Sequence, residues 1–235
     1  DANGNLLSTL YLLNTQDGNL VKIDQSEQIN IIGWSDDGHL VYTKIAAGAS
    51  ATDIARNRLI GFNQKNYGDT KELASSNSFN GVLMAGGKIF YAPSSVFQES
   101  AASAMYAVNA DGTGVQTILS QEVKTIVRSS YDTLGLGTDK EWYTYALGST
   151  ETAQLGSASA LQSSRLYIDN PSNDYSLWVD SRDGKGTLLN YDSKAKTEAT
   201  LLSRTGLRTP VYWLTDKHVI FRVSDSKETA DYIIN

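Results

Sequence analysis

The strongest constraint on the fold is a set of four Asp-Gly dipeptides, each close to a short run of aromatic and aliphatic residues. They are Asp17-Gly18, Asp37-Gly38, Asp111-Gly112 and Asp183-Gly184. Glycine after aspartate lets the backbone adopt the positive φ that a tight hairpin turn needs. The neighbouring runs, such as HLVYTK and SLWVDSR, are rich in residues that favour a pleated, half-buried strand. The sequence therefore predicts a series of antiparallel β-hairpins.

These hairpins belong to a longer internal repeat. Residues 31–44, 133–146 and 210–223 each contain an apolar strand, a tight polar turn and a second strand ending in aromatic residues, and 81–93 is a shorter version. A third and a fourth strand follow in most copies, and residues 165–203 read as a complete unit of four strands. We align the three long segments as the first and second strands of their repeats.

The spacing of the repeats predicts the architecture. Copies begin near residues 30, 81, 132, 165 and 208, and this spacing is close to the roughly 40–50 residues of a propeller blade. Four antiparallel strands in each repeat are also typical of a blade. We therefore predict an all-β fold, a β-propeller of four-stranded antiparallel blades, with five blades favoured and six as the alternative.

The two ends of the chain are expected to complete one another. The N-terminal hairpin, residues 10–24, is left over, and the last blade, 209–235, is incomplete. Because unpaired sheet edges favour aggregation, we expect both segments to share one sheet, so that N- and C-terminal strands close the ring. We interpret residues 1–235 as a single propeller domain. The chain opens at Asp1 without Met, and we expect it to be excised from a longer chain.

Three segments resemble a known repeat. They are Trp34-Ser35-Asp36-Asp37-Gly38 through Tyr42, residues 181–186 and residues 104–114. They are similar to the TolB-type, WD-like β-propeller repeat, although the proline usual after Trp-Ser is missing and residues 133–164 depart from the pattern. The resemblance implies a bacterial, extracytoplasmic protein (periplasmic, cell-surface or secreted) that serves as a scaffold for binding. Related propellers precede the catalytic domain of prolyl-oligopeptidase-type hydrolases, and the resemblance supplies no catalytic residue.

Composition excludes several classes of function. The net charge is -6 and the pI is about 4.9, and the absence of a Lys/Arg cluster argues against binding to nucleic acid or an anionic membrane. No apolar run approaches the roughly 18 residues of a membrane helix, so we expect no membrane insertion by this segment. The chain contains no cysteine, which excludes disulfides, thiolate zinc sites and a cysteine nucleophile.

No constellation in the sequence favours catalysis. His39 and His218 take the same repeat position at the start of a second strand, and we interpret both as turn residues in different blades. A serine nucleophile on a G-x-S-x-G elbow is absent. Asp36 with Asp37, and the group Asn170, Asn173 and Asp174, offer oxygen ligands to calcium, but Asx residues are also common in turns. We predict no catalytic residue, no metal site and no cofactor.

The tryptophans have a structural interpretation. Trp34 and Trp213 share a repeat position. We therefore expect both to be buried at equivalent places between blades, rather than to form a binding surface for glycans or peptides.

One side of the predicted propeller carries the longest loops. We assign residues 46–55, 94–103 and 148–163 to the links between second and third strands, which emerge on the same face as the links between blades. The latter links bring Arg128, Tyr131, Arg204 and Arg208 to that face, where we predict a ligand-binding anchor for an anion or a carboxylate. The alternative is that these arginines are simply solvated.

Two functions follow from these patterns. The first is a non-catalytic extracytoplasmic binding or assembly module that presents its loop-rich face to a protein or peptide, with a glycan as a further partner class. The alternative is the propeller accessory domain of a hydrolase, or a hydrolase itself, that acts on peptides or glycans.

The predicted closure of the ring can be tested by truncation. Deleting residues 1–24 is expected to cause aggregation or unfolding, because it removes strands that cover apolar surface and sheet edges. Size-exclusion chromatography and thermal melts measure the effect. A monomeric deletion protein with the melting temperature of the parent contradicts the prediction.

Overall fold

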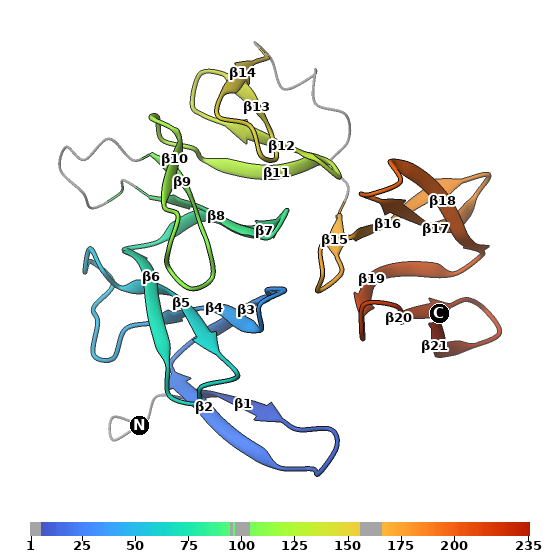
Figure 1. Ribbon diagram of the computed structural model, residues 1–235, viewed down its shortest axis with the longest axis horizontal. Helices are drawn as coiled ribbons and strands as arrows, with labels where there is room; N and C mark the ends of the chain where they lie inside the picture. The colour runs from blue at the N-terminus through green and yellow to red at the C-terminus, as the bar shows by residue number, and fades with distance from the viewer. Residues whose placement is uncertain (1–5, 95, 97–103, 156–165) are drawn as a thin grey trace. The chain divides into compact units, whose positions relative to one another are not determined.

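The computed structural model describes residues 6–94, 96, 104–155 and 166–235, and these residues form strands, turns and loops without a helix (Figure 1). The all-β prediction is therefore confirmed. The alternation of apolar and polar residues, together with the tight turns, favours strands throughout. The described residues also contain no helix long and apolar enough to cross a membrane.

The strands form five blades, named here in chain order. Blade 1 contains β3 (Ile29–Trp34), β4 (His39–Ile45), β5 (Asn57–Asn63) and β6 (Thr70–Ser76). Blade 2 contains β7 (Phe79–Ala85), β8 (Lys88–Pro93), β9 (Met105–Val108) and β10 (Gln116–Leu119). Blade 3 contains β11 (Thr125–Ser130), β12 (Thr133–Gly137), β13 (Trp142–Ala146) and β14 (Thr152–Gln154). Blade 4 contains β15 (Ile168–Asp169), β16 (Tyr175–Arg182), β17 (Lys185–Asp192) and β18 (Thr197–Arg204). Blade 5 contains β19 (Leu207–Trp213), β20 (Val219–Ser224) and β21 (Thr229–Ile234).

Every blade is an antiparallel meander, because its strands hydrogen-bond in the order in which they occur in the chain. This arrangement confirms the β-propeller and the preference for five blades over six. An additional two-stranded sheet, β1 (Ser8–Leu13) with β2 (Leu20–Ser26), precedes blade 1.

The chain divides into two compact units. The N-terminal unit comprises residues 1–84 and 88–126, and the C-terminal unit comprises residues 85–87 and 127–235. Since a propeller is a series of similar sheets, a division between blades does not distinguish one domain from two. The single domain over 1–235 stays a prediction, and each unit is described by itself.

The Asp-Gly turns have the predicted geometry. All four glycines have positive φ, from 71° at Gly184 to 88° at Gly38. In the turn after β3, the Ser35 amide donates to the His39 carbonyl, and the Asn109 amide donates in the same way to Thr113 in blade 2. At the β16–β17 hairpin Asp183 also has a positive φ of 51°. Two consecutive positive φ angles are what a two-residue type I′ turn requires.

The N-terminal unit is held together by the two faces of blade 1. One face contributes Leu40, Tyr42, Ile60 and Phe62, which pack against Leu10 of the β1–β2 hairpin. The other face packs on blade 2, with a core of Val41, Leu59, Ile89, Tyr91, Val108 and Ala110. Because side chains alternate along a strand, a single sheet can fill both interfaces.

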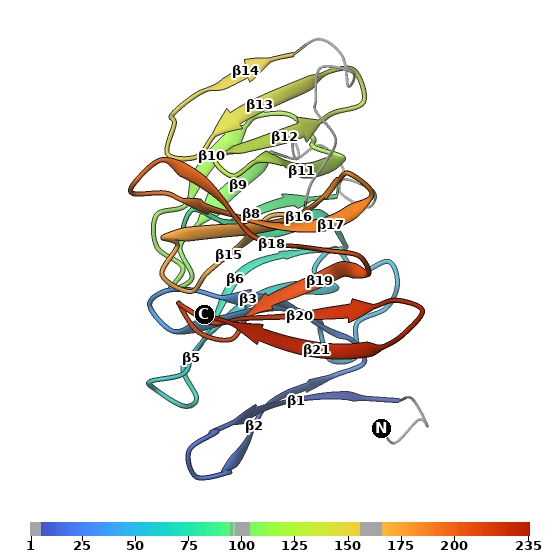
Figure 2. The ribbon, with the colours of Figure 1, turned by 90° about the vertical axis from the view of Figure 1, so that its right-hand side faces the viewer.

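The C-terminal unit contains two apolar clusters on either side of blade 4. Leu177 and Leu188 of blade 4 pack against Leu207, Val211 and other apolar residues of blade 5. On the opposite face, Trp178 and Leu189 pack with Tyr167 and Tyr191. Figure 2 shows β19, β20 and β21 side by side in the three-stranded sheet of blade 5.

The prediction that residues 10–24 and 209–235 share one sheet is wrong for the described strands. β1 and β2 pair with one another in a two-stranded sheet, and β19 to β21 form a separate sheet of three. The hairpin has its own apolar partner in blade 1 and is anchored there by Asp24, whose carboxylate accepts hydrogen bonds from the Tyr42 hydroxyl and the Lys44 ammonium, both at 2.7 Å. Deleting residues 1–24 is thus expected to uncover blade 1.

The predicted alignment of residues 133–146 with the first and second strands of the other repeats is also wrong, because it is shifted by one strand. Residues 133–146 are the second and third strands, β12 and β13, because β11 precedes them. The sequence of β11 has only two adjacent apolar residues before Arg128, which is too short a pattern to be recognised as a strand. In consequence residues 148–163 do not link second and third strands. They contain β14, and 156–163 lie outside the described residues.

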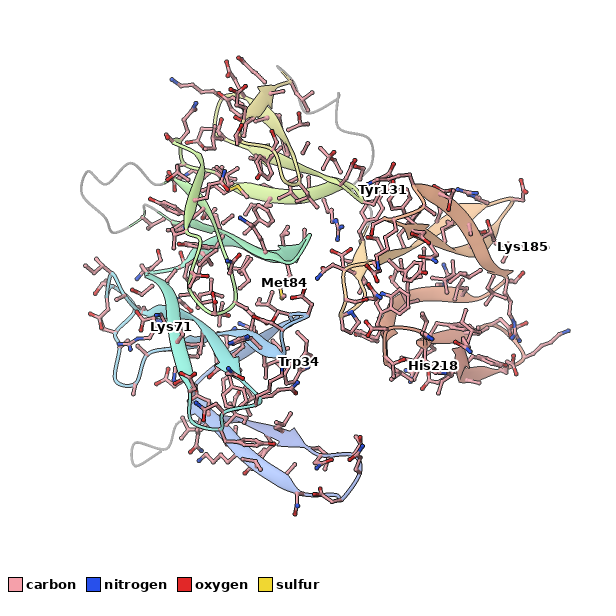
Figure 3. All side chains as sticks on the ribbon, viewed as in Figure 1. Trp34, Lys71, Met84, Tyr131, Lys185 and His218 are labelled. Atoms are coloured by element: carbon pink, nitrogen blue, oxygen red, sulfur yellow. The ribbon has the colours of Figure 1, made fainter. Side chains whose placement is uncertain are left out.

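Trp34 and Trp213 occupy equivalent positions, as predicted, because each ends the first strand of its blade. The prediction that both side chains are buried is wrong. Trp213 is half-buried, with its indole N–H donating to the Ile168 carbonyl at 3.0 Å and its ring near Tyr175. Trp34, labelled in Figure 3, is 39% exposed, because the hairpin before blade 1 places its apolar residues on Leu40 and its neighbours instead.

The hairpin anchor makes a prediction about acid stability. Partial burial opposes ionisation of Asp24, but hydrogen bonds from Lys44, Tyr42 and the Gln25 amide outweigh it and hold the pKa of this carboxyl below its ordinary value of 3.8. A lowered pKa in the folded state gives stability that is complete above the ordinary value and is lost as the pH falls through the folded value. At pH 7 the variant Asp24→Asn should lower the free energy of unfolding by about 1.5–3 kcal/mol.

Urea unfolding at a series of pH values tests this anchor. The difference between the parent and Asp24→Asn should shrink as the pH drops below 3.8. Asp69→Asn, a change at an exposed aspartate of the β5–β6 turn, is the control and should follow the parent. A difference that is independent of pH would contradict a role for the Asp24 charge.

Candidate functional site

A cavity of ≈ 290 Å³ lies between blade 1 and blade 2 of the N-terminal unit. Its walls come from the first three strands of blade 1 and from the start of blade 2. The lining residues are Asn30, Ile32, Thr43, Asn57, Ser78, Phe79 and Val82.

Strand register explains why polar residues meet here. Asn30 pairs with Thr43 across β3 and β4, and Thr43 pairs in turn with Leu59 across β4 and β5. Cross-strand partners point to the same side of a sheet. Asn30 and Thr43 therefore continue the row of Val41 and Leu59, which faces blade 2 in the core. The interface is apolar along most of its length and becomes polar at the end where β4 finishes and β5 begins.

Several polar atoms of this cavity have no partner within the described part of the chain. Thr43 is only 9% exposed, yet no described residue forms a hydrogen bond with its hydroxyl group. The Ser78 hydroxyl and the Asn30 amide nitrogen also lack a bond of this kind there. Asn57 uses its amide nitrogen to donate to the Asn77 carbonyl, and its side-chain oxygen stays available. Asn30 is exposed, and Asn57 and Ser78 are half-buried, so these polar atoms can bond with a group that enters the cavity.

The loop of residues 46–55 is fastened to the same end of blade 1. Asn77 is buried, and its side-chain nitrogen donates to the carbonyls of Ala51 and Asp53, both at 2.8 Å. Within the loop, the Asp53 carboxylate accepts a hydrogen bond from the Ser50 amide at 2.7 Å. Asn77 directly precedes Ser78 of the cavity wall, and Asn57 follows the loop. The cavity and this loop therefore form one feature, which we call the blade 1–2 site.

Of the four residues predicted to bind a ligand, Arg128 is held inside the C-terminal unit. Its side chain is 7% exposed, and its guanidinium donates to the Asp169 carboxylate at 2.8 Å and to the Tyr131 carbonyl. Asp169 also accepts a hydrogen bond from the Ser176 hydroxyl. The charge of Arg128 is thus compensated by blade 4, and the pair joins β11 to β15.

Tyr131 lies in the turn between β11 and β12, where Figure 3 labels it. Its ring stacks on Tyr191 of β17, with 3.5 Å between the ring centroids. A hydrogen bond with Tyr191 raises the pKa of the Tyr131 phenol above its ordinary value. Tyr131 therefore takes part in the packing between blades 3 and 4.

Arg204 and Arg208 lie near the link between blades 4 and 5. The Arg204 guanidinium is paired with Glu228 and lies over the ring of Tyr232, 4.9 Å from its centroid. Arg208 is exposed, and no described residue forms an ion pair with it.

The structure does not bring the four residues together. Arg204 pairs with Gly186 at the start of β17, whereas Tyr131 stacks on Tyr191 near its end. Five residues of strand separate Gly186 from Tyr191, which corresponds to roughly 17 Å. The reason is the strand missed in blade 3: Arg128 and Tyr131 belong to a strand and its hairpin turn, and not to a link between blades. Of the other predicted loop, 94–103, only residues 94 and 96 are among the described residues.

Both histidines take part in turns. His39 Nδ1 is 2.8 Å from the Asp37 carboxylate, and His218 Nδ1 is 2.9 Å from the Thr215 hydroxyl. The Ser35 hydroxyl donates to Asp37 and accepts from the His39 amide. It therefore supports the turn instead of donating to the imidazole ring, as a nucleophile of a triad would. Among the described residues, no three His, Asp or Glu side chains are grouped as metal ligands would be.

The blade 1–2 site was not found from the sequence, although one signal was present. Asn30, Thr43 and Asn57 each stand at a strand position that faces the neighbouring blade, where an apolar residue is expected. Such a set becomes visible only when the register of three strands is known, because the residues are 13 and 14 positions apart.

Comparison with known proteins supports the fold and goes no further. Neither a family model nor a curated protein sequence matches the chain. Among solved structures, TolB from Acinetobacter baumannii superposes with a TM-score of 0.52 at 13% identity, over 96% of this chain and 56% of that one. The β-propeller domain of the Trilobed protease from Pyrococcus furiosus gives 0.54 at 11% identity, over 97% and 74%. A prolyl endopeptidase gives 0.54 at 11%, over 100% and 36%.

These similarities show that the chain has the β-propeller fold of TolB and of protease propeller domains. The chain spans about half the length of the TolB structure and about a third of that of the prolyl endopeptidase.

The position of Arg128 predicts a large effect on stability. Replacing it with alanine leaves the Asp169 carboxylate, whose side chain is 13% exposed, without its cation, and the broken pair should lower the free energy of unfolding by about 3 kcal/mol. Arg208→Ala removes an exposed side chain and should change it by about 0.5 kcal/mol or less. Urea unfolding of both variants measures the contrast. Equal effects would contradict the assignment of Arg128 to the packing between blades 3 and 4.

Proposed function

We propose that this chain is a non-catalytic, extracytoplasmic binding module that holds a protein or peptide partner at the blade 1–2 site. The observation that carries the proposal is the cavity, whose lining includes the Thr43 and Ser78 hydroxyls and the Asn30 amide nitrogen, all without a hydrogen bond from a described residue. A glycan is the alternative partner class.

The scaffold suits this role. Blade 1 is fixed on both faces by apolar packing, and the loop of residues 46–55 is anchored by Asn77. A loop held by a rigid sheet can present side chains to a partner without losing much conformational freedom on binding. The extracytoplasmic location is supported by the resemblance of the repeats to the TolB type.

The residues predicted to bind a ligand differ in whether their side chains are still available for a contact. Arg208 is exposed and carries no ion pair with a described residue, so it can contribute a contact to an anionic group that binds the C-terminal unit. Arg128, Tyr131 and Arg204 are engaged with Asp169, Tyr191 and Glu228. We propose that these three stabilise the surface of the C-terminal unit through those contacts.

A propeller accessory domain of a hydrolase is the second candidate. The similarity in fold to the Trilobed protease propeller and to a prolyl endopeptidase favours it. Labelling of the natural, full-length protein by a fluorophosphonate probe, which reacts with activated serines, would support this candidate over the first.

Site-directed photo-crosslinking tests the binding module. Ile54 and Tyr67 are 60% and 59% exposed and flank the two ends of β5, roughly 23 Å apart along the strand. A benzoylphenylalanine at position 54 should crosslink one discrete partner in cells that express the protein. The same group at position 67 is the matched control and should not.

The outcome at the two positions decides the assignment. Crosslinking from position 67 alone would place the partner at the other ends of the strands and overturn the proposed site. A product from neither position, at normal levels of folded protein, would contradict binding at blade 1.

A further inference from the structure

We infer that the cavity of the blade 1–2 site receives an uncharged, apolar side chain of a peptide, while its polar rim holds the peptide amides beside that side chain. The inference rests on the proposed function and specifies its ligand. Four properties of the cavity carry it: its charge, its apolar wall, its unpartnered polar atoms and its volume.

The seven lining residues include no charged side chain. A charged group entering the cavity would lose water without gaining an opposite charge, which is unfavourable. The group that enters is therefore neutral. This property separates the cavity from the remainder of an acidic chain with 46 charged residues, 20 basic and 26 acidic.

The apolar wall favours an aliphatic or aromatic side chain over a sugar. Ile32, Phe79 and Val82 pack partly against the core between blades 1 and 2. Phe79 meets Tyr91 edge-on, with 6.2 Å between centroids and 88° between planes. A sugar binds best on an open aromatic face, whereas this ring is partly buried against the core between blades 1 and 2. Burial of an apolar side chain against such a wall is favourable.

The polar atoms complement a peptide backbone. Each amide of a peptide has one N–H donor and one carbonyl acceptor. The Asn57 side-chain oxygen can accept from such an N–H, and the Asn30 amide nitrogen can donate to a carbonyl. The hydroxyls of Thr43 and Ser78 can do either. Because these groups have no partner among the described residues, a peptide amide would satisfy them without breaking existing bonds.

The volume limits the ligand to about one residue. At ≈ 290 Å³ the cavity lies just below the roughly 300–1,000 Å³ of small-molecule pockets. This space suits one side chain and the amides beside it. It is too small for a folded element, so the remainder of a peptide would extend over the loop of residues 46–55.

Capped amino acids provide a direct test that needs no knowledge of the natural partner. The probe is N-acetyl-leucine N′-methylamide, titrated into the ¹⁵N-labelled protein and followed by two-dimensional NMR. We expect saturable shifts at the backbone amides of Thr43, Ser78 and Val82 and at the side-chain amides of Asn30 and Asn57. The glutamate analogue should bind at least about tenfold more weakly, because its charge would be desolvated in a neutral cavity.

Two variants localise the binding. Asn30→Trp places a large side chain at the mouth of the cavity, at an exposed position that tolerates it, and should abolish the shifts. Lys65→Trp introduces the same side chain in the turn between β5 and β6, at an exposed position outside the lining, and should leave the shifts unchanged.

The outcomes separate this inference from the function on which it rests. Saturable shifts at the same residues from methyl β-D-glucopyranoside but not from the leucine probe would overturn the peptide assignment and leave a binding module. Absence of any leucine-induced shift, with crosslinking from position 54, would also overturn the inference and keep the proposed function. Equal affinity for the leucine and glutamate probes would contradict the neutral cavity.

Discussion

The structure depends on one constraint, which is that a sheet with apolar residues on both faces must be covered on both faces. Blade 1 illustrates it. Tyr42 and Phe62 point to the β1–β2 hairpin, while Val41 and Leu59 point to blade 2. Successive residues of one strand therefore serve two interfaces, and blade 4 repeats the arrangement with Trp178 and Leu177. Both faces of blade 1 are occupied by packing, and the cavity lies at the ends of its strands.

This constraint also explains where the cavity forms. The apolar interface between blades 1 and 2 continues until Thr43 and Asn30 replace the aliphatic residues expected at their positions. Polar side chains pack against an apolar wall less favourably than Leu and Ile do, and the cavity lies at this end of the interface. The loop of residues 46–55 stays beside this gap because Asn77, which is buried, holds two of its carbonyls.

Sequence reasoning succeeded where the structure is decided by neighbours along the chain. The Asp-Gly turns and the alternation beside them specify hairpins locally, so the all-β fold, blade 4 and the five-blade count could be predicted. It failed where the outcome depends on distant residues. β11 is a strand because blade 3 needs a first strand, and its own sequence hardly shows it. The exposure of Trp34 depends on the hairpin that precedes blade 1, and the site depends on the register of three strands.

The same distinction explains why conspicuous residues and functional residues differ here. A single arginine attracts attention in a sequence, but Arg128 already has the carboxylate of Asp169 and the carbonyl of Tyr131 as partners. A ligand could engage its guanidinium only by displacing them, and the gain would be offset by leaving Asp169 unpaired. Thr43 is inconspicuous in the sequence, yet it lines the cavity and its hydroxyl has no partner among the described residues. A polar group can bind a ligand where its hydrogen-bonding capacity is not already used, and this condition depends on its neighbours in the fold rather than on residue type.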